Sequence, residues 1–484
     1  MSESQPLLSG ERERVTSKSY FVRTIIPFLL LQASVGLCAS LQATFYPIEA
    51  EAKGASAAQF GAVFGIIHLS LFIFGPLVGK YLSVWGVKAI FPAGFVIDGG
   101  TFILFGLLQW VDDTSTFLVF SYLIRFLEGV GAAATWTSNL SILMAKFPER
   151  KATVKAWCDA AFNFGLTIGP VIGAFLYDAG GFFLPFAVTG SAILLSGLLV
   201  LFTTEFPDME TGGMDLPMKK VLGNVRVLVA LITCSVGAYT VGTLEATLSP
   251  FLLELEISVK MIAVAFLVMS LCSVLATPLF GFICDSKFSP WLVSGIGTLL
   301  MFVCFVFIGP CPYMSFIPAT FASVCGSLVA QGFGCSAVLV ASFSSAQIAA
   351  VAAGFPDSME VQAVVSGLFT SAFALGNFCG PTVSGVLYDI VGFEYNLLVL
   401  QALVIIIFIM NMIVYCVPPL EVEHEAEIDT PSPSKEDLER KPSDAYPELA
   451  ADIIRSRAAP PRPTSTRKYS TSSSVYERGQ HLVF

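Results

Sequence analysis

The chain has 484 residues, of which 55% are apolar and only 13% are charged, and its mean hydropathy is +0.76. Soluble domains contain about 25% charged residues, so this composition excludes an ordinary soluble globular protein. The formal net charge is −10, of which the C-terminal tail (418–484) supplies only about −3, and we expect no nucleic-acid partner.

Runs of about 20 apolar residues are long enough to cross a bilayer as a helix. Their number predicts an all-α polytopic membrane protein with 12 transmembrane helices in two homologous six-helix halves, although eleven or thirteen spans stay open. The predicted spans lie near 24–46, 58–80, 88–110, 117–146, 153–178, 183–204, 227–250, 261–284, 290–310, 314–341, 362–388 and 394–417.

These spans divide the chain into five predicted parts. They are an N-terminal tail (1–20), a first half (21–204), a central loop (205–224), a second half (225–417) and a C-terminal tail (418–484). Lysine and arginine gather before span 1, around the 2–3 and 4–5 loops and between the halves. By the positive-inside rule both termini are therefore expected in the cytoplasm.

One segment occurs twice and supports the division into halves. The residues 161–182 return 211 positions later as 372–393, with ten of 22 positions identical, including Gly169-Pro170 against Gly380-Pro381. Weaker matches recur in the same order, such as PLVG (76–79) against PLFG (278–281). Such internal repeats are typical of transporters whose substrate cavity lies between the halves near the membrane midplane.

The tails have a different composition. The C-terminal tail is acidic at first and then rich in Pro, Ser, Thr and Arg, which predicts disorder. Residues 3–8 (ESQPLL) and 446–449 (YPEL) resemble sorting signals. We therefore expect sorting adaptors as possible partners, and a vesicular or endolysosomal membrane rather than the plasma membrane.

Four motifs carry a resemblance to a known family. RFLEGVGAA (125–133), GPVIGAFLYD (169–178), LEATLSP (244–250) and FYPIEAEAKGAS (45–56) are similar to segments of the major facilitator superfamily and of its vesicular amine transporters. The polyamine branch is the most similar. The resemblance implies an antiporter without a resident cofactor, with Arg125 as an intramembrane arginine and Glu245 in the place of the amine carriers' span-7 acid.

The sequence departs from the family pattern in two respects. In the 2–3 loop Ser83 stands in the position of an acid while Gly86 is retained, whereas the second half keeps its acid as Asp285. The cytoplasmic latch that this motif implies is therefore expected to be one-sided. Spans 1 and 10 also contain no Asp or Glu, which argues against monoamine substrates such as serotonin or dopamine.

Charges at membrane depth are costly and need a reason. Arg125 and Glu128 lie three residues apart on one helical face, as a proton-coupling pair or as a permanent structural ion pair. Glu245 has no cation within a helical turn; it suits a proton carrier or an ammonium counter-ion, or it is a hydrated acid near the lumenal mouth. Asp98 is a weaker proton-coupling candidate.

The remaining candidates are assigned by residue type and place. Besides Glu245 and Arg125, the substrate-binding candidates are the aromatic residues Trp136 and Tyr239, whose rings attract ammonium groups. Asp159 is expected to form a local pair with Lys155, and a lone His68 is more often a core residue. A conformational role is predicted for Gly169, Pro170, Gly380, Pro381, Asp178, Asp389, Gly86 and Asp285. The two Gly-Pro pairs are expected to shape the contact of spans 5 and 11 across the halves.

These observations together predict a proton-coupled antiporter of organic cations, polyamines or monoamines, that fills acidic vesicles by alternating access. An exporter of drugs or other small organic molecules, and a non-transporting receptor or scaffold, stay open. We expect a monomer in the lipid bilayer and no enzyme, because the sequence has no P-loop, metal-binding spacing or nucleophile elbow. An ion gradient, most simply of protons, is therefore the expected energy source.

Overall fold

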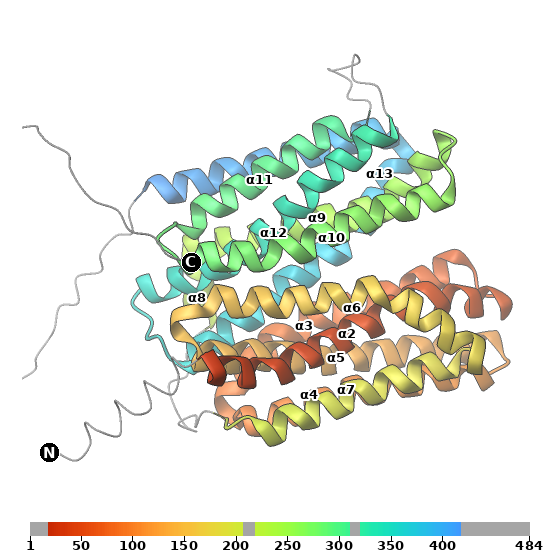
Figure 1. Ribbon diagram of the computed structural model, residues 1–484, viewed down its shortest axis with the longest axis horizontal. Coiled ribbons are helices and arrows are strands. Elements are labelled where there is room, and N and C mark those ends of the chain that lie inside the picture. The colour runs from red at the N-terminus through yellow and green to blue at the C-terminus, as the bar shows by residue number, and fades with distance from the viewer. Residues whose placement is uncertain (1–17, 207–217, 310–319, 418–484) are drawn as a thin grey trace, which may run out of the picture. The chain divides into compact units, whose positions relative to one another are not determined.

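The computed structural model describes residues 18–206, 218–309 and 320–417, and in these residues the regular secondary structure is entirely helical. The predicted tails and central loop lie mostly outside this part of the chain, as do both sorting signals. The long helices, which Figure 1 labels, are α2 (Lys18–Ala52), α3 (Ala57–Trp85), α4 (Val87–Gly106), α5 (Thr114–Lys146), α6 (Lys151–Gly180), α7 (Phe183–Thr203), α9 (Val225–Glu254), α10 (Val259–Cys284), α11 (Pro290–Phe307), α12 (Phe321–Ala352) and α13 (Met359–Cys416).

Eleven helices in the described residues are long and apolar enough to cross a membrane. The last of them, α13, has 58 residues, far more than the 20 or so that one span requires. It is interrupted at Gly392, whose φ of 80° is unfavourable for any residue with a Cβ atom. The helix therefore contains two spans, and the structure is consistent with the twelve that the sequence predicts.

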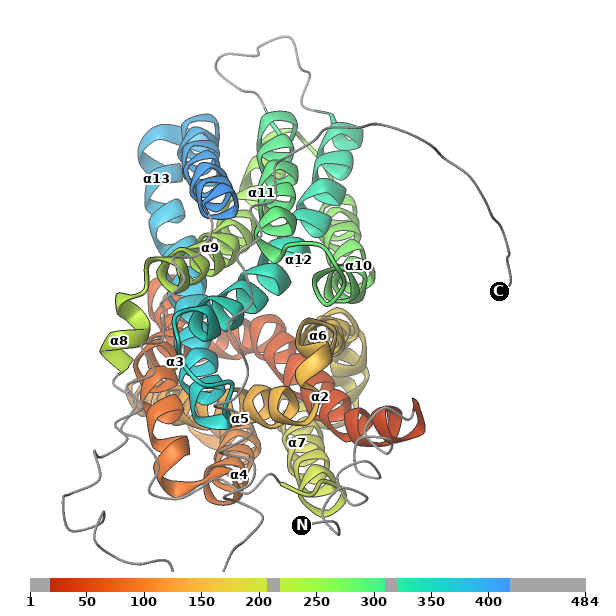
Figure 2. The ribbon, with the colours of Figure 1, turned by 90° about the vertical axis from the view of Figure 1, so that its left-hand side faces the viewer.

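The helices form two groups that follow the order of the chain. Helices α2 to α7 contact one another, and so do α9 to α13; the two groups are the red-to-yellow and green-to-blue ribbons of Figures 1 and 2. The groups meet where α3 and α5 contact α13 and where α6 contacts α10. The short helix α8 (Met218–Gly223) precedes α9.

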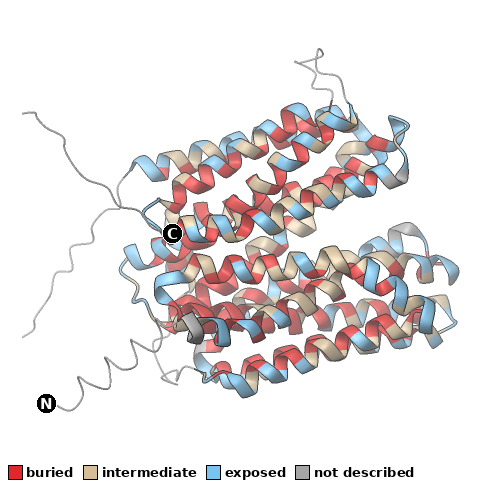
Figure 3. Ribbon diagram, viewed as in Figure 1, coloured by how far each residue is buried: buried red, intermediate tan, exposed pale blue. Residues whose placement is uncertain are grey.

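Burial follows the helix faces. Small, polar and large apolar residues are buried between helices, and many further large apolar residues are exposed. Figure 3 shows exposed positions along the outer helices. Phe202 is 82% exposed and Phe175 is 74% exposed. Apolar exposure of this extent marks a membrane-facing surface rather than one in water, so the composition and the structure agree on a membrane protein.

The repeated glycines allow close helix contacts within each half. An added Cβ atom at Gly165 would meet the backbone carbonyl of Ala33 on α2, and at Gly376 it would meet that of Ser235 on α9. The sequence predicts that spans 5 and 11 use this face to touch across the halves, and that prediction is wrong. The glycines instead hold α6 against α2 and α13 against α9, each in its own half.

Most predicted spans agree with the helices to within a few residues, but span 10 does not. Its predicted end is residue 341, whereas α12 continues to Ala352. The additional residues include Ser342, Ser345 and Gln347, which are buried against protein rather than lipid. Hydropathy misses them because helix contacts in membranes favour small and polar residues.

Candidate functional site

A cavity lies inside the first half, between α2, α3, α4, α5 and α6. Its volume is about 90 Å³, and because one water needs roughly 10–15 Å³ by this measure, several can occupy it. Most of its wall is apolar, but polar groups from four helices reach it. They include Gln32, His68, Asp98, Glu128, Thr135 and Trp136.

Arg125 and Glu128 form an ion pair at the base of this cavity, as the spacing on α5 predicts. The Arg125 Nη1 atom lies 2.6 Å from Glu128 Oε1, and both residues are buried. Gln42 of α2 completes the group. Its amide donates to Glu128 Oε2 at 2.8 Å and its carbonyl accepts a hydrogen bond from Arg125. The pair is thereby tied to a second helix.

Asp98 and His68 face the same cavity, and each has one polar side-chain atom without a hydrogen-bond partner among the described residues. Asp98 is 1% exposed, and its Oδ2 atom and the Nδ1 atom of His68 are buried without a hydrogen bond among the described residues. Gly131 of α5 lies against the Asp98 backbone, where any Cβ atom would clash. Because buried polar atoms are rarely left unpaired, the cavity is suited to waters or a polar ligand that bonds to them.

Trp136 lines the cavity with its aromatic ring and also contacts a residue of the second half. Its ring centroid lies 5.2 Å from that of Phe162 and 5.7 Å from that of Phe373 on α13. The same ring is therefore part of the cavity wall in the first half and of the contact with the second half. The role of Trp136 in substrate binding stays a prediction.

The two predicted binding residues of α9 have different environments. Glu245 is exposed, and no ion pair or hydrogen bond joins it to any other residue in the described ranges. Tyr239 is buried instead, and its hydroxyl accepts a hydrogen bond from Ser384 Oγ of α13 at 3.1 Å. Tyr239 thus stabilises the α9–α13 contact and does not line the cavity of the first half.

The halves meet closely at the end of the bundle where α2 begins and α13 ends, which we call the terminal end and which the positive-inside rule predicts to be cytoplasmic. The glycines of the repeated PLxG segments occupy equivalent contacts there. An added Cβ atom at Gly79 of α3 would lie 2.7 Å from Ala363 O of α13, and at Gly281 of α10 it would lie 2.9 Å from Ala152 O of α6. The second helix of each half therefore contacts the fifth helix of the other half: α3 contacts α13, and α10 contacts α6.

Hydrogen bonds also join the two halves at the terminal end. Asp285 of α10 accepts from the backbone N–H groups of Ala152 and Thr153 on α6, at 2.9 and 2.6 Å. The corresponding first turn of α13 has no side-chain cap from its own Ser358. Asp285 thus joins the two halves through hydrogen bonds, and the one-sidedness of the latch stays a prediction.

Three other predicted conformational residues have simple local settings. Gly86 joins α3 to α4 with a φ of 75°, a backbone conformation that explains the glycine at this position of the loop motif. Asp178 and Asp389, from the repeated LYD, are both exposed. Each lies at the end of its helix, α6 or the first part of α13, that is farther from the terminal end. A gate role for these two acids stays a prediction.

Two sets of contacts escape sequence reasoning. Gln42 lies 83 residues from Arg125, and a neutral residue in an apolar span gives no signal of a charged partner. Lys155 does pair with Asp159, as their spacing predicts, but it also contacts Phe343 and Phe369 of the second half. Among 42 phenylalanines no pattern distinguishes these two.

Comparison with known families and proteins agrees with this architecture. Residues 28–359 match the model of the Major Facilitator Superfamily. The chain is 33% identical to the human (Homo sapiens) MFS-type transporter SLC18B1 over 375 residues, which are 76% of this chain and 81% of that protein. It is 24% identical to the human synaptic vesicular amine transporter over 345 residues, 70% of this chain and 63% of that one.

Two solved structures share the fold at low sequence identity. The human organic anion transporter MFSD10 (TETRAN) superposes with a TM-score of 0.62 and 17% identity, over 80% of this chain and 99% of that one. A bacterial homologue of the iron transporter ferroportin, in an outward-facing state, gives a TM-score of 0.63 and 12% identity, over 80% and 98%. At these identities the likeness extends to the fold alone.

Proposed function

The chain belongs to the Major Facilitator Superfamily and is a transporter related to SLC18B1 and the vesicular amine transporters, and on that premise we propose that it exchanges organic cations for protons. The proposed substrates are polyamines in the first place and monoamines in the second. The proposed location of the protein is a vesicular or endolysosomal membrane, with both termini in the cytoplasm.

One observation carries the proposal. Two acids, Asp98 and Glu128, reach a single cavity that is large enough for several waters, and among the described residues the Oδ2 atom of Asp98 has no hydrogen-bond partner. A structural ion pair needs neither the second acid nor the cavity. Acids at membrane depth that face a wet cavity are typical of proton pathways, so this arrangement supports proton coupling in the first half.

Glu245 supplies the complementary part of the proposal in the second half. Its carboxylate is accessible and, among the described residues, has no cationic partner, so it is available to a substrate ammonium group. Trp136 adds an aromatic face, and cation–π attraction contributes about 0.5–2 kcal/mol. In the proposed cycle, protons entering from an acidic lumen release the cation, the halves rock, and the protons leave to the cytosol.

Uptake into proteoliposomes tests the function. Purified protein is reconstituted with an imposed acidic interior, and radiolabelled spermidine uptake is measured with and without a protonophore. Proton exchange predicts uptake that collapses with the protonophore. No uptake of spermidine, monoamines or drug-like cations by folded protein would contradict the proposal.

The Glu245→Gln variant tests the assignment of residues. It keeps the size and hydrogen-bonding capacity of the side chain and removes the charge, so it should abolish pH-driven uptake. Uptake with unchanged proton coupling would show that Glu245 has no such role. Glu254→Gln is the matched control, because Glu254 lies on the same helix and bonds to Tyr388 instead.

A further inference from the structure

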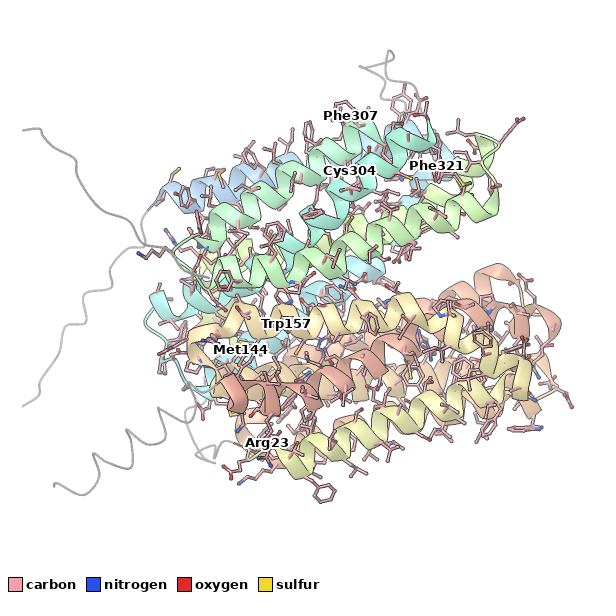
Figure 4. All side chains as sticks on the ribbon, in the orientation of Figure 1. Arg23, Met144, Trp157, Cys304, Phe307 and Phe321 are labelled. Atoms are coloured by element: carbon pink, nitrogen blue, oxygen red, sulfur yellow. The ribbon has the colours of Figure 1, made fainter. Side chains whose placement is uncertain are left out.

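Lys155 is a buried cation that the proposed cycle does not use. It lies in the first part of α6 and is 3% exposed. Its ammonium donates a hydrogen bond to Asp159 Oδ2, one turn along the same helix. The neighbouring Trp157 is 44% exposed and is labelled on α6 in Figure 4. Because two residues turn a helix by about 200°, Lys155 lies on the opposite, protein-facing side.

The second half provides the remaining contacts of the Lys155 ammonium. Its Nζ atom lies 4.9 Å from the ring centroid of Phe369 on α13 and 5.6 Å from that of Phe343 on α12. The two rings are themselves packed edge to face, with centroids 5.0 Å apart, and both are buried. The aromatic wall is therefore built by the second half alone and receives a cation from the first.

A carboxylate and two aromatic rings around one cation make up the chemistry that recognises an ammonium group. The carboxylate supplies a charge-assisted hydrogen bond, and ring faces attract cations more strongly when water is excluded. The butylammonium side chain of lysine is an alkylammonium ion held to the chain at one end. The site that Lys155 fills thus matches the chemical class of the proposed substrate.

We propose that Asp159, Phe343 and Phe369 form a second ammonium site, completed only when the halves meet at the terminal end, and that Lys155 is its tethered occupant. In this conformation the lysine holds the end closed. When the halves separate, Asp159 and Lys155 leave with the first half, and the aromatic wall is left without its cation. The proposal rests on the proposed function only for its link to a transported amine.

The place of this ammonium site supports that link. Lys155 and Asp159 lie in the first turns of α6, Phe343 lies in the last turns of α12, and Phe369 lies in the first turns of α13. The site therefore lies at the terminal end of the bundle. A substrate ammonium that is present as the end closes would meet a site of its own chemical kind and would compete there with the lysine for Asp159 and the aromatic wall.

Chemical rescue tests the proposal without relying on transport. Lys155→Ala is made in a Glu245→Gln background, so that amine binding at Glu245 does not contribute, and the unfolding midpoint is measured in detergent. The variant should unfold at a lower temperature, because Asp159 loses its counter-charge. Millimolar n-butylammonium should reverse at least half of this decrease in the unfolding midpoint, and its effect should saturate with concentration. The neutral analogue n-butanol and an equal concentration of sodium chloride should not.

Control variants separate the ammonium site from a general effect of charge. Lys151→Ala removes an inter-half ion pair with Asp357 that has no aromatic wall, so butylammonium should not rescue it. Replacing both Phe343 and Phe369 by Leu should weaken the rescue of Lys155→Ala about tenfold in butylammonium concentration, equivalent to about 1.4 kcal/mol.

Poor folding of Lys155→Ala would itself be informative. Butylammonium added during purification should then increase the yield of monodisperse protein, whereas Lys155→Ala with Asp159→Asn should fold without it and show no rescue. Equal effects of butylammonium and butanol would overturn the proposal. Rescue without any amine uptake by the unmodified chain would sustain the ammonium site and reject the transport function.

Discussion

Asp285 of the second half caps the first turn of α6 in the first half, where its Oδ1 atom accepts a hydrogen bond from the Ala152 N–H at 2.9 Å. The start of α6 has no side-chain cap of its own from Arg150. A carboxylate there satisfies free N–H groups and complements the helix dipole. Since the acid and the helix belong to different halves, the cap also holds the terminal end closed.

Asp285→Ala should therefore favour opening of the terminal end. Loss of a helix cap costs about 1 kcal/mol, which corresponds to roughly a fivefold change in the closed-to-open ratio. Cys284 is buried beside Asp285 and lines the cavity between the halves at this end. Its labelling rate by a thiol reagent, followed by peptide mass spectrometry, should rise by that factor. Ser286→Ala is the control, because Ser286 bonds only within its own turn, and equal labelling in both variants would reject the latch.

A second inter-half contact, between Lys151 and Asp357, allows a prediction about pH. Burial opposes ionisation of Asp357, but hydrogen bonds from Lys151 and Gln362 outweigh it and hold the pKa of this carboxyl below its usual value of 3.8. A depressed pKa means that the ion pair stabilises the closed end fully above the usual pKa and ceases to do so as pH falls through the lowered one.

The Lys151–Asp357 contribution should consequently be constant between about pH 5 and 8. Lys151→Ala should raise Cys284 labelling by the same modest factor at both limits, less than about fivefold, because partly exposed pairs contribute at most about 1 kcal/mol. Asp357→Asn should act like Lys151→Ala. A Lys151→Ala effect that disappears at pH 5 would place the titration elsewhere.

Much of the fold is predictable because membrane helices have a strong signal in sequence. Apolar runs of sufficient length locate the spans, and the offset of 211 residues between the two Gly-Pro segments indicates the repeat. The predicted partner of those glycines is wrong, because a small-residue face shows that a close contact exists and not which helix makes it.

Local pairs within the site are predictable, whereas contacts between distant elements are not. The spacing of Arg125–Glu128 and of Lys155–Asp159 places each pair on one helical face, and both pairs occur. Gln42 and the aromatic wall at Lys155 depend on how α2, α12 and α13 are placed. Helix periodicity alone does not contain that information.

The network at the base of the cavity predicts different outcomes for its two charged members. Glu128→Gln keeps hydrogen-bonding atoms for Gln42 and Arg125, so the protein should fold while proton-coupled uptake falls. Arg125→Met leaves Glu128 as a buried charge without its counter-ion, which costs about 3–5 kcal/mol, and should unfold or fail to express. Folding is measured by thermal unfolding in detergent and function by protonophore-sensitive uptake. Normal coupling in Glu128→Gln would leave the pair with a structural role only.

The glycine contacts within the halves give the last prediction. Gly165→Ala and Gly376→Ala each place a methyl group against a backbone carbonyl of the neighbouring helix, which a side-chain rotation cannot relieve. Overpacking of this kind costs about 1–3 kcal/mol, so both variants should lower the unfolding midpoint by several degrees. Gly385→Ala is the matched control, since nothing lies within 4 Å of its added Cβ atom, and it should match the unmodified chain or exceed it slightly because alanine favours the helix. Equal stability of Gly165→Ala and Gly385→Ala would mean that this glycine face does not hold α6 against α2, and that the two helices pack through other residues.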